Sequence, residues 1–197
     1  MVLQSLNQLI SEVLQIVSER RILLFGSSSL FASFPEHPPA TIGVETTLDA
    51  DFFLDPDDEN LRAALLIKLG KERDYHLTHG YYGDFVDLRL ANAFPEGWRD
   101  RLVPMLGFDN VFALHPMDMA VSKVNATARS RIDRRFGRRE ADRGLKDINT
   151  LVALIKAGLL DFAELAHQVH KLDHEPALIV ECARVLDEVR AFVNETK

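Results

Sequence analysis

The chain has 197 residues, 47% of them hydrophobic and 27% charged, which is enough apolar material for the core of one large or two small domains. The formal net charge of −7 excludes a general nucleic-acid coat protein, which needs many clustered cations, but it leaves room for one local basic patch. With a single cysteine, no leader-like N-terminus and no long apolar run, we expect a soluble, cytoplasmic protein without an intrachain disulfide.

The first part of the chain alternates helix and strand patterns. Apolar residues at steps of three and four predict an amphipathic helix over residues 3–17. The apolar run 22–25 predicts a buried strand, and Gly26 with the serines at 27–29 predicts a turn into a short helix. Prolines and a glycine in residues 35–47 predict an exposed connection.

The segment after this connection predicts a strand with carboxylates on one face. Within residues 48–54, Asp49, Asp51 and Phe53 occupy alternate positions, and a period of two places their side chains on the same face of a strand. The intervening residues are all apolar and would form the buried face: Ala50, Phe52 and Leu54.

A helix and two strands are expected next. Pro56 and the acidic residues after it predict a helix start, with the helix near residues 58–70. Strands are predicted near residues 73–79 and 84–90. The helix residues expected to face the core are all leucines: Leu61, Leu65, Leu66 and Leu69.

Helical patterns dominate from about residue 111. Pro116 and Asp118 predict the start of a helix that runs through Val124. Gly158 suits the end of a helix and Pro176 the start of another. Further helices are predicted near residues 140–157, 161–171 and 175–194.

These patterns together predict an α+β fold in two parts. Residues 1–110 would form an α/β core with a mixed sheet flanked by helices, and residues 111–197 a helical C-terminal region.

Asp49 and Asp51 are the candidate metal ligands. Two carboxylates at i and i+2 on a strand share a face, with Cβ atoms about 7 Å apart. Burying two like charges together is costly unless a cation neutralises them. Carboxylate oxygens suit Mg²⁺ or Mn²⁺, and Mg²⁺ completes its ligands with waters and substrate phosphates. The pair therefore predicts a metal site that handles a phosphate substrate.

The turn at Gly26, Ser27 and Ser28 is the candidate phosphate-binding element. Glycine permits close backbone approach, and free N–H groups and a hydroxyl can hold phosphate oxygens. Asp87 is expected to complete the metal site as a third carboxylate, because it stands among apolar residues as a strand-borne ligand would. Asp84, beside Gly83, is the alternative.

These residues resemble the DNA polymerase β-like nucleotidyltransferase superfamily, whose pattern is Gly-Ser after a first strand, Asp-x-Asp on the next strand and then one more acidic residue. Here the pattern is Gly26-Ser27, Asp49-Ala50-Asp51 and Asp87. The stretch Thr46–Asp51 is similar to the Ser/Thr-x-Asp-x-Asp of the bacterial toxin-type, abortive-infection-like branch.

The second half extends the resemblance to residues 20–160. Residues 116–123 and Lys146-Asp147 resemble the helix pair of that branch, with its Lys and its Lys-Asp. The resemblance implies a nucleotidyltransferase-like fold and transfer of a nucleotidyl group from an NTP to an acceptor such as RNA, tRNA, a protein or a small molecule. It implies that Asp49, Asp51 and Asp87 are catalytic, that Lys123 contacts the triphosphate and that Asp147 holds a neighbouring cationic side chain.

Two other functions stay open. Many relatives carry an arginine where this chain has Glu45, which motivates a catalytically degenerate binding module acting as a sensor or toxin–antitoxin component with a partner chain. A metal-dependent phosphatase of the Asp-x-Asp type is a third class, although its acidic pair usually ends the first strand.

Residues 129–143 are dense in arginine and contain seven of them against three acidic residues. Such a run is usually a solvated face, but a patch of net charge +4 in an acidic protein can also receive a nucleotide or an RNA end. The seven residues are Arg129, Arg131, Arg134, Arg135, Arg138, Arg139 and Arg143.

Overall fold

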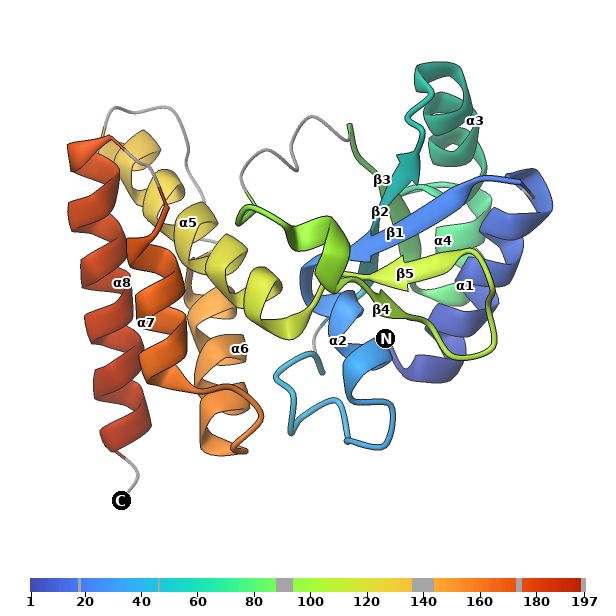
Figure 1. The fold of residues 1–197 in the computed structure, drawn as a ribbon. Coiled ribbons are helices and arrows are strands. Elements are labelled where there is room, and N and C mark those ends of the chain that lie inside the picture. The colour runs from blue at the N-terminus through green and yellow to red at the C-terminus, as the bar shows by residue number, and fades with distance from the viewer. Residues whose placement is uncertain (18, 46, 88–93, 136–143, 173–174, 196–197) are drawn as a thin grey trace.

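The structure is a computed structural model, and it describes residues 1–17, 19–45, 47–87, 94–135, 144–172 and 175–195. In this part of the chain a mixed five-stranded sheet has the strand order β3-β2-β1-β5-β4 (Figure 1). β1 runs antiparallel to β2 and parallel to β5, β2 runs parallel to β3, and β4 runs antiparallel to β5. The strands are β1 (Arg21–Phe25), β2 (Asp49–Asp55), β3 (Tyr82–Phe85), β4 (Val103–Pro104) and β5 (Val111–Ala113).

Helices surround the sheet and continue beyond it. In Figure 1, α1, α3 and α4 lie around the sheet at the right, and α5 to α8 pack together at the left. The α+β fold, with a mixed sheet flanked by helices and followed by C-terminal helices, is therefore confirmed. The helices are α1 (Leu3–Ile16), α2 (Leu30–Ser33), α3 (Glu59–Leu69), α4 (Asp74–His79), α5 (Pro116–Arg135), α6 (Gly144–Lys156), α7 (Phe162–His170) and α8 (Pro176–Asn194), with 3-10 turns η1 (Gly26–Ser29) and η3 (Trp98–Arg101).

None of the helices in the described residues combines the length and the apolar composition that crossing a membrane would require.

The core explains the strand and helix patterns. α1 buries one apolar stripe completely, and β2 buries Ala50, Phe52 and Leu54 completely on the face opposite its carboxylates. Phe53, on the carboxylate face, is also only 1% exposed and stacks on Phe25 of β1, with ring centroids 4.0 Å apart. Both faces of β2 are therefore covered around the middle of the strand.

The strand predicted near residues 73–79 is wrong, because this segment is helix α4. Asp74 lies in its first turn, and the chain leaves the helix at Gly80, whose φ of 78° is the left-handed conformation that glycine favours. The strand predicted near 84–90 is β3, which begins earlier and ends at Phe85. Residues 88–90 lie outside the described part of the chain.

The connection over residues 35–47 is not uniformly exposed, contrary to the prediction. Ile42 and Val44 are completely buried. Between them Gly43 packs against α6, where Thr150 Oγ1 donates a hydrogen bond of 2.9 Å to the Gly43 carbonyl oxygen. A Cβ atom at Gly43 would lie 2.7 Å from Thr150 Cα, so the connection is held against the helix.

The inward face of α3 is narrower than predicted. Leu65 and Leu69 are completely buried, whereas Leu66 is 36% exposed and Leu61 is only partly buried. Residues 65 and 66 are about 100° apart around a helix, so both cannot face the same core. The inward assignment of Leu66 is wrong.

The second part of the chain begins with a strand. β5 pairs with β1 inside the sheet, although it follows the boundary predicted near residue 110, and the helices begin with α5. Gly158 ends the helix before it with a φ of 71°, and Pro176 occupies the first turn of α8, as predicted.

Candidate functional site

Asp49 and Asp51 lie at the start of β2 with their side chains on one face. Strand pairing places Phe25 of β1 and Asp84 of β3 opposite Asp51 on its two sides. Paired residues on neighbouring strands project to the same face, with backbones about 4.8 Å apart. The sheet therefore gathers three carboxylates, those of Asp49, Asp51 and Asp84, on one surface.

Gly26 lies directly against the Asp51 carboxylate. It follows β1 with a φ of 64°, and a Cβ atom built on it would lie 2.3 Å from Asp51 Oδ2. Any larger residue would collide with that oxygen and would also strain the backbone. The glycine therefore allows the turn after β1 and the carboxylates of β2 to form one site.

The serine turn η1 is buried and ordered by its own hydroxyls. Ser27, Ser28 and Ser29 are at most 6% exposed. Ser28 Oγ donates to the Phe25 carbonyl oxygen at 3.2 Å, and Ser29 Oγ donates to the Gly26 carbonyl oxygen at 2.7 Å. Two of the three hydroxyls thus brace the turn, so its shape is fixed before any ligand arrives.

The third carboxylate beside the pair is Asp84, the alternative of the sequence analysis. Strand register places it opposite Asp51, and its side chain is exposed. Asp87 follows the end of β3 and faces α3, where its Oδ2 lies 3.6 Å from Arg62 Nη2. Strand pairing does not bring Asp87 to the other two carboxylates.

The electrostatics of the site follow from this crowding. Burial raises the pKa of Asp51 to about 7, and the neighbouring charges of Asp49 and Asp84 act in the same direction. Lys123 and Lys146 oppose them and favour the charged carboxylate. Ionising the Asp51 carboxyl group therefore costs free energy, and a bound cation would offset that cost.

Both lysines come from the helical part of the chain. Lys123 on α5 is 7% exposed, and its Nζ donates to Asp147 Oδ1 of α6 at 2.5 Å. Asp147 therefore holds a cationic side chain, as the resemblance implies, and that side chain is Lys123 itself. Lys146 Nζ lies 3.9 Å from Asp49 Oδ1. Sequence reasoning gave Lys146 no role at the site, because only the folded chain brings α6 to the start of β2.

Asp49 and Asp51 could hold a metal ion only if other groups completed its coordination. In the described part of the chain no group of three or more His, Cys, Asp or Glu side chains could hold a metal ion by itself. Mg²⁺ commonly binds through one or two carboxylates, waters and substrate phosphates. Asp49 and Asp51 would supply two such carboxylates, and the remaining ligands would have to come from water and substrate.

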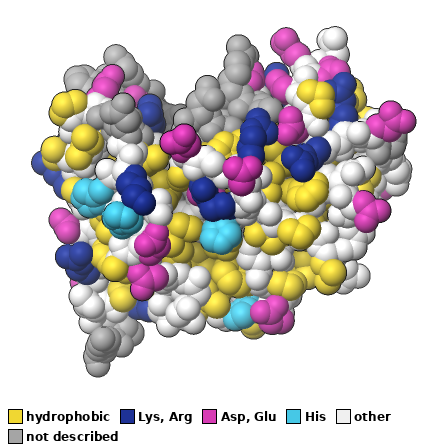
Figure 2. Space-filling model, viewed as in Figure 1, with side chains coloured by type: hydrophobic (Ala, Val, Ile, Leu, Met, Phe, Trp, Pro, Cys, Tyr) yellow, Lys and Arg dark blue, Asp and Glu magenta, His cyan; other side chains and the backbone are white. Residues whose placement is uncertain are grey.

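A separate pocket lies where α2, β4 and the start of α5 meet. It is open to solvent and has a volume of about 450 Å³, and its lining includes Phe34, Val103, Met117 and Leu160 but none of the three site carboxylates, Asp49, Asp51 and Asp84. Figure 2 shows hydrophobic side chains across the middle of the face seen in Figure 1, with charged and histidine side chains among them. This pocket is apolar in character and is not part of the carboxylate site.

Comparison with protein-family models, with curated proteins and with solved structures gave no match to this chain.

Proposed function

We propose that this chain is a cytoplasmic, metal-dependent nucleotidyltransferase that moves a nucleotidyl group from an NTP to an acceptor hydroxyl. The observation that carries the proposal is the contact between Gly26 and Asp51, where a Cβ atom would lie 2.3 Å from the carboxylate oxygen. A turn able to hold phosphate oxygens and a pair of carboxylates able to hold a cation thus meet at one point. Nucleotide transfer uses both on one triphosphate.

The residues of the site would divide the work. Asp49 and Asp51 would hold Mg²⁺ or Mn²⁺, which when bound neutralises the triphosphate and the charge that develops in the transition state. The backbone N–H groups of the turn at Gly26 and the Ser27 hydroxyl would hold phosphate oxygens. Lys123, held by Asp147, would donate hydrogen bonds to the triphosphate.

The reaction breaks one bond and forms one. The acceptor oxygen attacks the α-phosphorus, and the bond from that phosphorus to its bridging oxygen breaks, so that pyrophosphate leaves. The proton of the acceptor hydroxyl must pass to a nearby base. Asp87 was expected from the sequence to be the third carboxylate of the site. Asp84, exposed and in register with Asp51, is the better placed carboxylate.

Transfer of label tests this proposal. The protein is incubated with each α-³²P-labelled NTP, with Mg²⁺ or Mn²⁺, and with tRNA, protein or aminoglycoside as the acceptor. We expect Asp51→Asn to lower transfer at least about a hundredfold. Asp109→Asn, which removes an exposed carboxylate from a turn, is the matched control and should retain activity. Equal labelling by Asp51→Asn and the unmodified protein would refute the mechanism.

A second candidate is a binding module with the same fold and no turnover, acting as a sensor or as one half of a toxin–antitoxin pair. It is favoured by the position of Lys146, whose ammonium lies 3.9 Å from Asp49 and can neutralise that carboxylate without a metal. Calorimetry separates the two functions. Nucleotide binding that is equally tight with EDTA and with Mg²⁺, and that releases no pyrophosphate, would select the binding module.

A further inference from the structure

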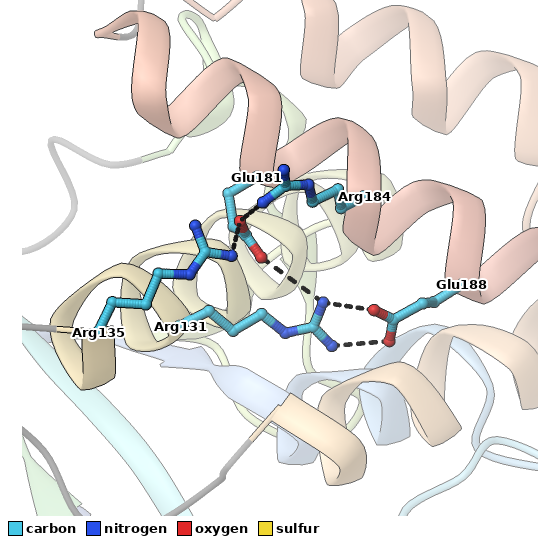
Figure 3. A network of polar contacts seen from close by, with 5 residues as sticks. All are labelled: Arg131, Arg135, Glu181, Arg184 and Glu188. Carbon is cyan, nitrogen blue, oxygen red and sulfur yellow. Dashed lines mark hydrogen bonds and ion pairs between the residues drawn. The ribbon is translucent and has the colours of Figure 1, made fainter.

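A network of arginines and glutamates joins α5 to α8, away from any role in the proposed reaction (Figure 3). At its centre the Glu181 side chain is only 2% exposed. Its Oε2 accepts hydrogen bonds from Arg135 Nη2 at 2.6 Å and from Arg184 Nη1 at 3.0 Å, and Arg131 Nη1 lies 3.8 Å from its Oε1. Three guanidinium groups therefore converge on one buried carboxylate.

The network carries more positive charge than it neutralises. Arg131 is balanced separately, because both of its terminal nitrogens donate to the two oxygens of Glu188, at 2.6 and 2.7 Å. Arg135 and Arg184 then share a single oxygen of Glu181. Two cations on one carboxylate leave an excess charge of +1 at this point.

Arg135 and Arg184 remain accessible to a ligand. Their side chains are 55% and 56% exposed, and each guanidinium has five N–H donors, of which the bond to Glu181 uses one. The buried Glu181 fixes the ends of both side chains, so a ligand meets positioned donors. The buried Glu181 carboxylate needs a cationic partner, but one arginine neutralises it, so helix packing alone does not explain two arginines on one oxygen.

A groove opens along this network. It has a volume of about 510 Å³, and with four arginines and two glutamates in its lining the net charge is +2. Arg131, Arg134 and Arg135 stand three and four residues apart on α5, so they line one face of that helix. Arg184 lines the opposite side from α8. The formal charge of the whole chain is −7, so the groove is a local attraction for anions on a protein that otherwise repels them.

We propose that this α5–α8 arginine groove binds phosphates of a single nucleic-acid strand. The planar guanidinium fork matches two oxygens of a phosphate, and a strand offers such groups at regular intervals along a groove. A nucleic-acid strand also fits the three arginines along α5, with Arg184 of α8 on the opposite side, better than one isolated anion does. The proposal stands on the groove alone and does not require the transfer reaction.

Fluorescence anisotropy with labelled 12-nucleotide RNA and DNA strands tests the groove, in EDTA and without NTP. The test variant is Arg135→Gln with Arg184→Gln, and the matched control, Lys68→Gln with Lys71→Gln, removes two exposed charges at the end of α3. We expect the test variant to weaken binding at least about tenfold in 50 mM salt. The slope of log affinity against log salt should fall by about 1.4, since each neutralised phosphate of a single strand contributes about 0.7. The control should change neither quantity.

A charge-retaining variant keeps the proposal testable if the glutamine variant is poorly folded. Arg135→Lys with Arg184→Lys preserves both charges and loses both forks, so we expect the salt slope to stay and the affinity to fall. Whichever strand binds more tightly, RNA or DNA, identifies the source of the phosphates. Four results would overturn the proposal. In the first two, the unmodified protein binds neither strand, or the control that replaces two lysines by glutamine loses as much affinity as the test variant. In the other two, polyglutamate displaces the bound strand as well as unlabelled nucleic acid does, or the groove binds inorganic phosphate but neither strand.

Discussion

Gly26→Ala should destabilise the protein in two ways, through its backbone conformation and through a collision with Asp51. A φ of 64° costs an alanine about 1–2 kcal/mol, because its Cβ crowds the backbone in the left-handed region. The new Cβ would also lie 2.3 Å from Asp51 Oδ2, and such overpacking typically costs about 1–3 kcal/mol. We therefore expect a total loss of about 2–5 kcal/mol in the free energy of unfolding, measured with urea.

A matched glycine separates the two contributions. Gly158 has a φ of 71°, and nothing lies within 4 Å of a Cβ built there. Gly158→Ala should therefore show only the backbone cost of about 1–2 kcal/mol. In an Asp51→Ala background the collision at Gly26 disappears, and Gly26→Ala should fall to the same range. The double-mutant cycle should then report a coupling of about 1–3 kcal/mol between residues 26 and 51.

A Cβ atom at residue 26 would also push the Asp51 carboxylate out of position, and this should impair function. Since moving a catalytic group by about 1 Å can lower a rate a hundredfold, Gly26→Ala should lose nucleotide transfer by about that factor even where it remains folded. The proposed collision is refuted if Gly26→Ala lowers the free energy of unfolding no more than Gly158→Ala does and shows no coupling to Asp51.

Three further outcomes are expected. Arg101→Ala should lower the free energy of unfolding in urea by about 3–5 kcal/mol, because it removes the two-nitrogen partner of the Asp118 carboxylate, which is only 3% exposed. Arg99→Ala, which breaks a more exposed pair, should cost less than about 1 kcal/mol, and equal losses would count against the argument. Cys182 should react with a thiol reagent at pH 8 at least about a hundredfold more slowly in the folded protein than in urea, because it is buried and burial raises its pKa to about 11; fast labelling of the native protein would contradict this. Lys123→Met should weaken NTP binding in calorimetry at least about tenfold, and unchanged affinity would exclude the contact with the triphosphate.

The strong local patterns predicted the long elements well. α1 repeats its apolar residues with helical spacing, and β2 alternates two carboxylates with fully buried side chains, so each pattern alone indicated its secondary structure. Gly158 and Pro176 likewise mark helix ends through their own backbone chemistry. In these segments local preference and tertiary packing agree.

The misassigned and missed elements are short or depend on distant partners. α4 is a helix of six residues whose sequence also alternates in type, and only Gly80 marks its end. β5 has three residues and pairs with β1 from about ninety positions away in the chain, so nothing local identifies it. The packing of Gly43 against α6 is likewise a contact between segments far apart in the chain.

The sequence predicted which types of residue form the candidate site, but it did not predict how the strands that carry them pair. Gly26, Asp49 and Asp51 could be chosen from spacing, since a turn after one strand and a carboxylate pair on the next are local features. The choice between Asp84 and Asp87 depends on which residues of β3 pair with β2, and no local sequence pattern indicates that pairing. Lys146 was named in the resemblance but given no role at the site for a similar reason, because a helix far along the chain brings it to Asp49.

Asp49 and Asp51 are proposed to share one divalent cation that also binds the phosphates of an NTP. Mn²⁺ binding, followed by electron paramagnetic resonance with a non-hydrolysable NTP, measures this directly. We predict that the unmodified protein and Asp109→Asn bind one tight Mn²⁺ only when the nucleotide is present, and that Asp49→Asn and Asp51→Asn each lose it. Mn²⁺ binding of equal strength in all four proteins would contradict the account.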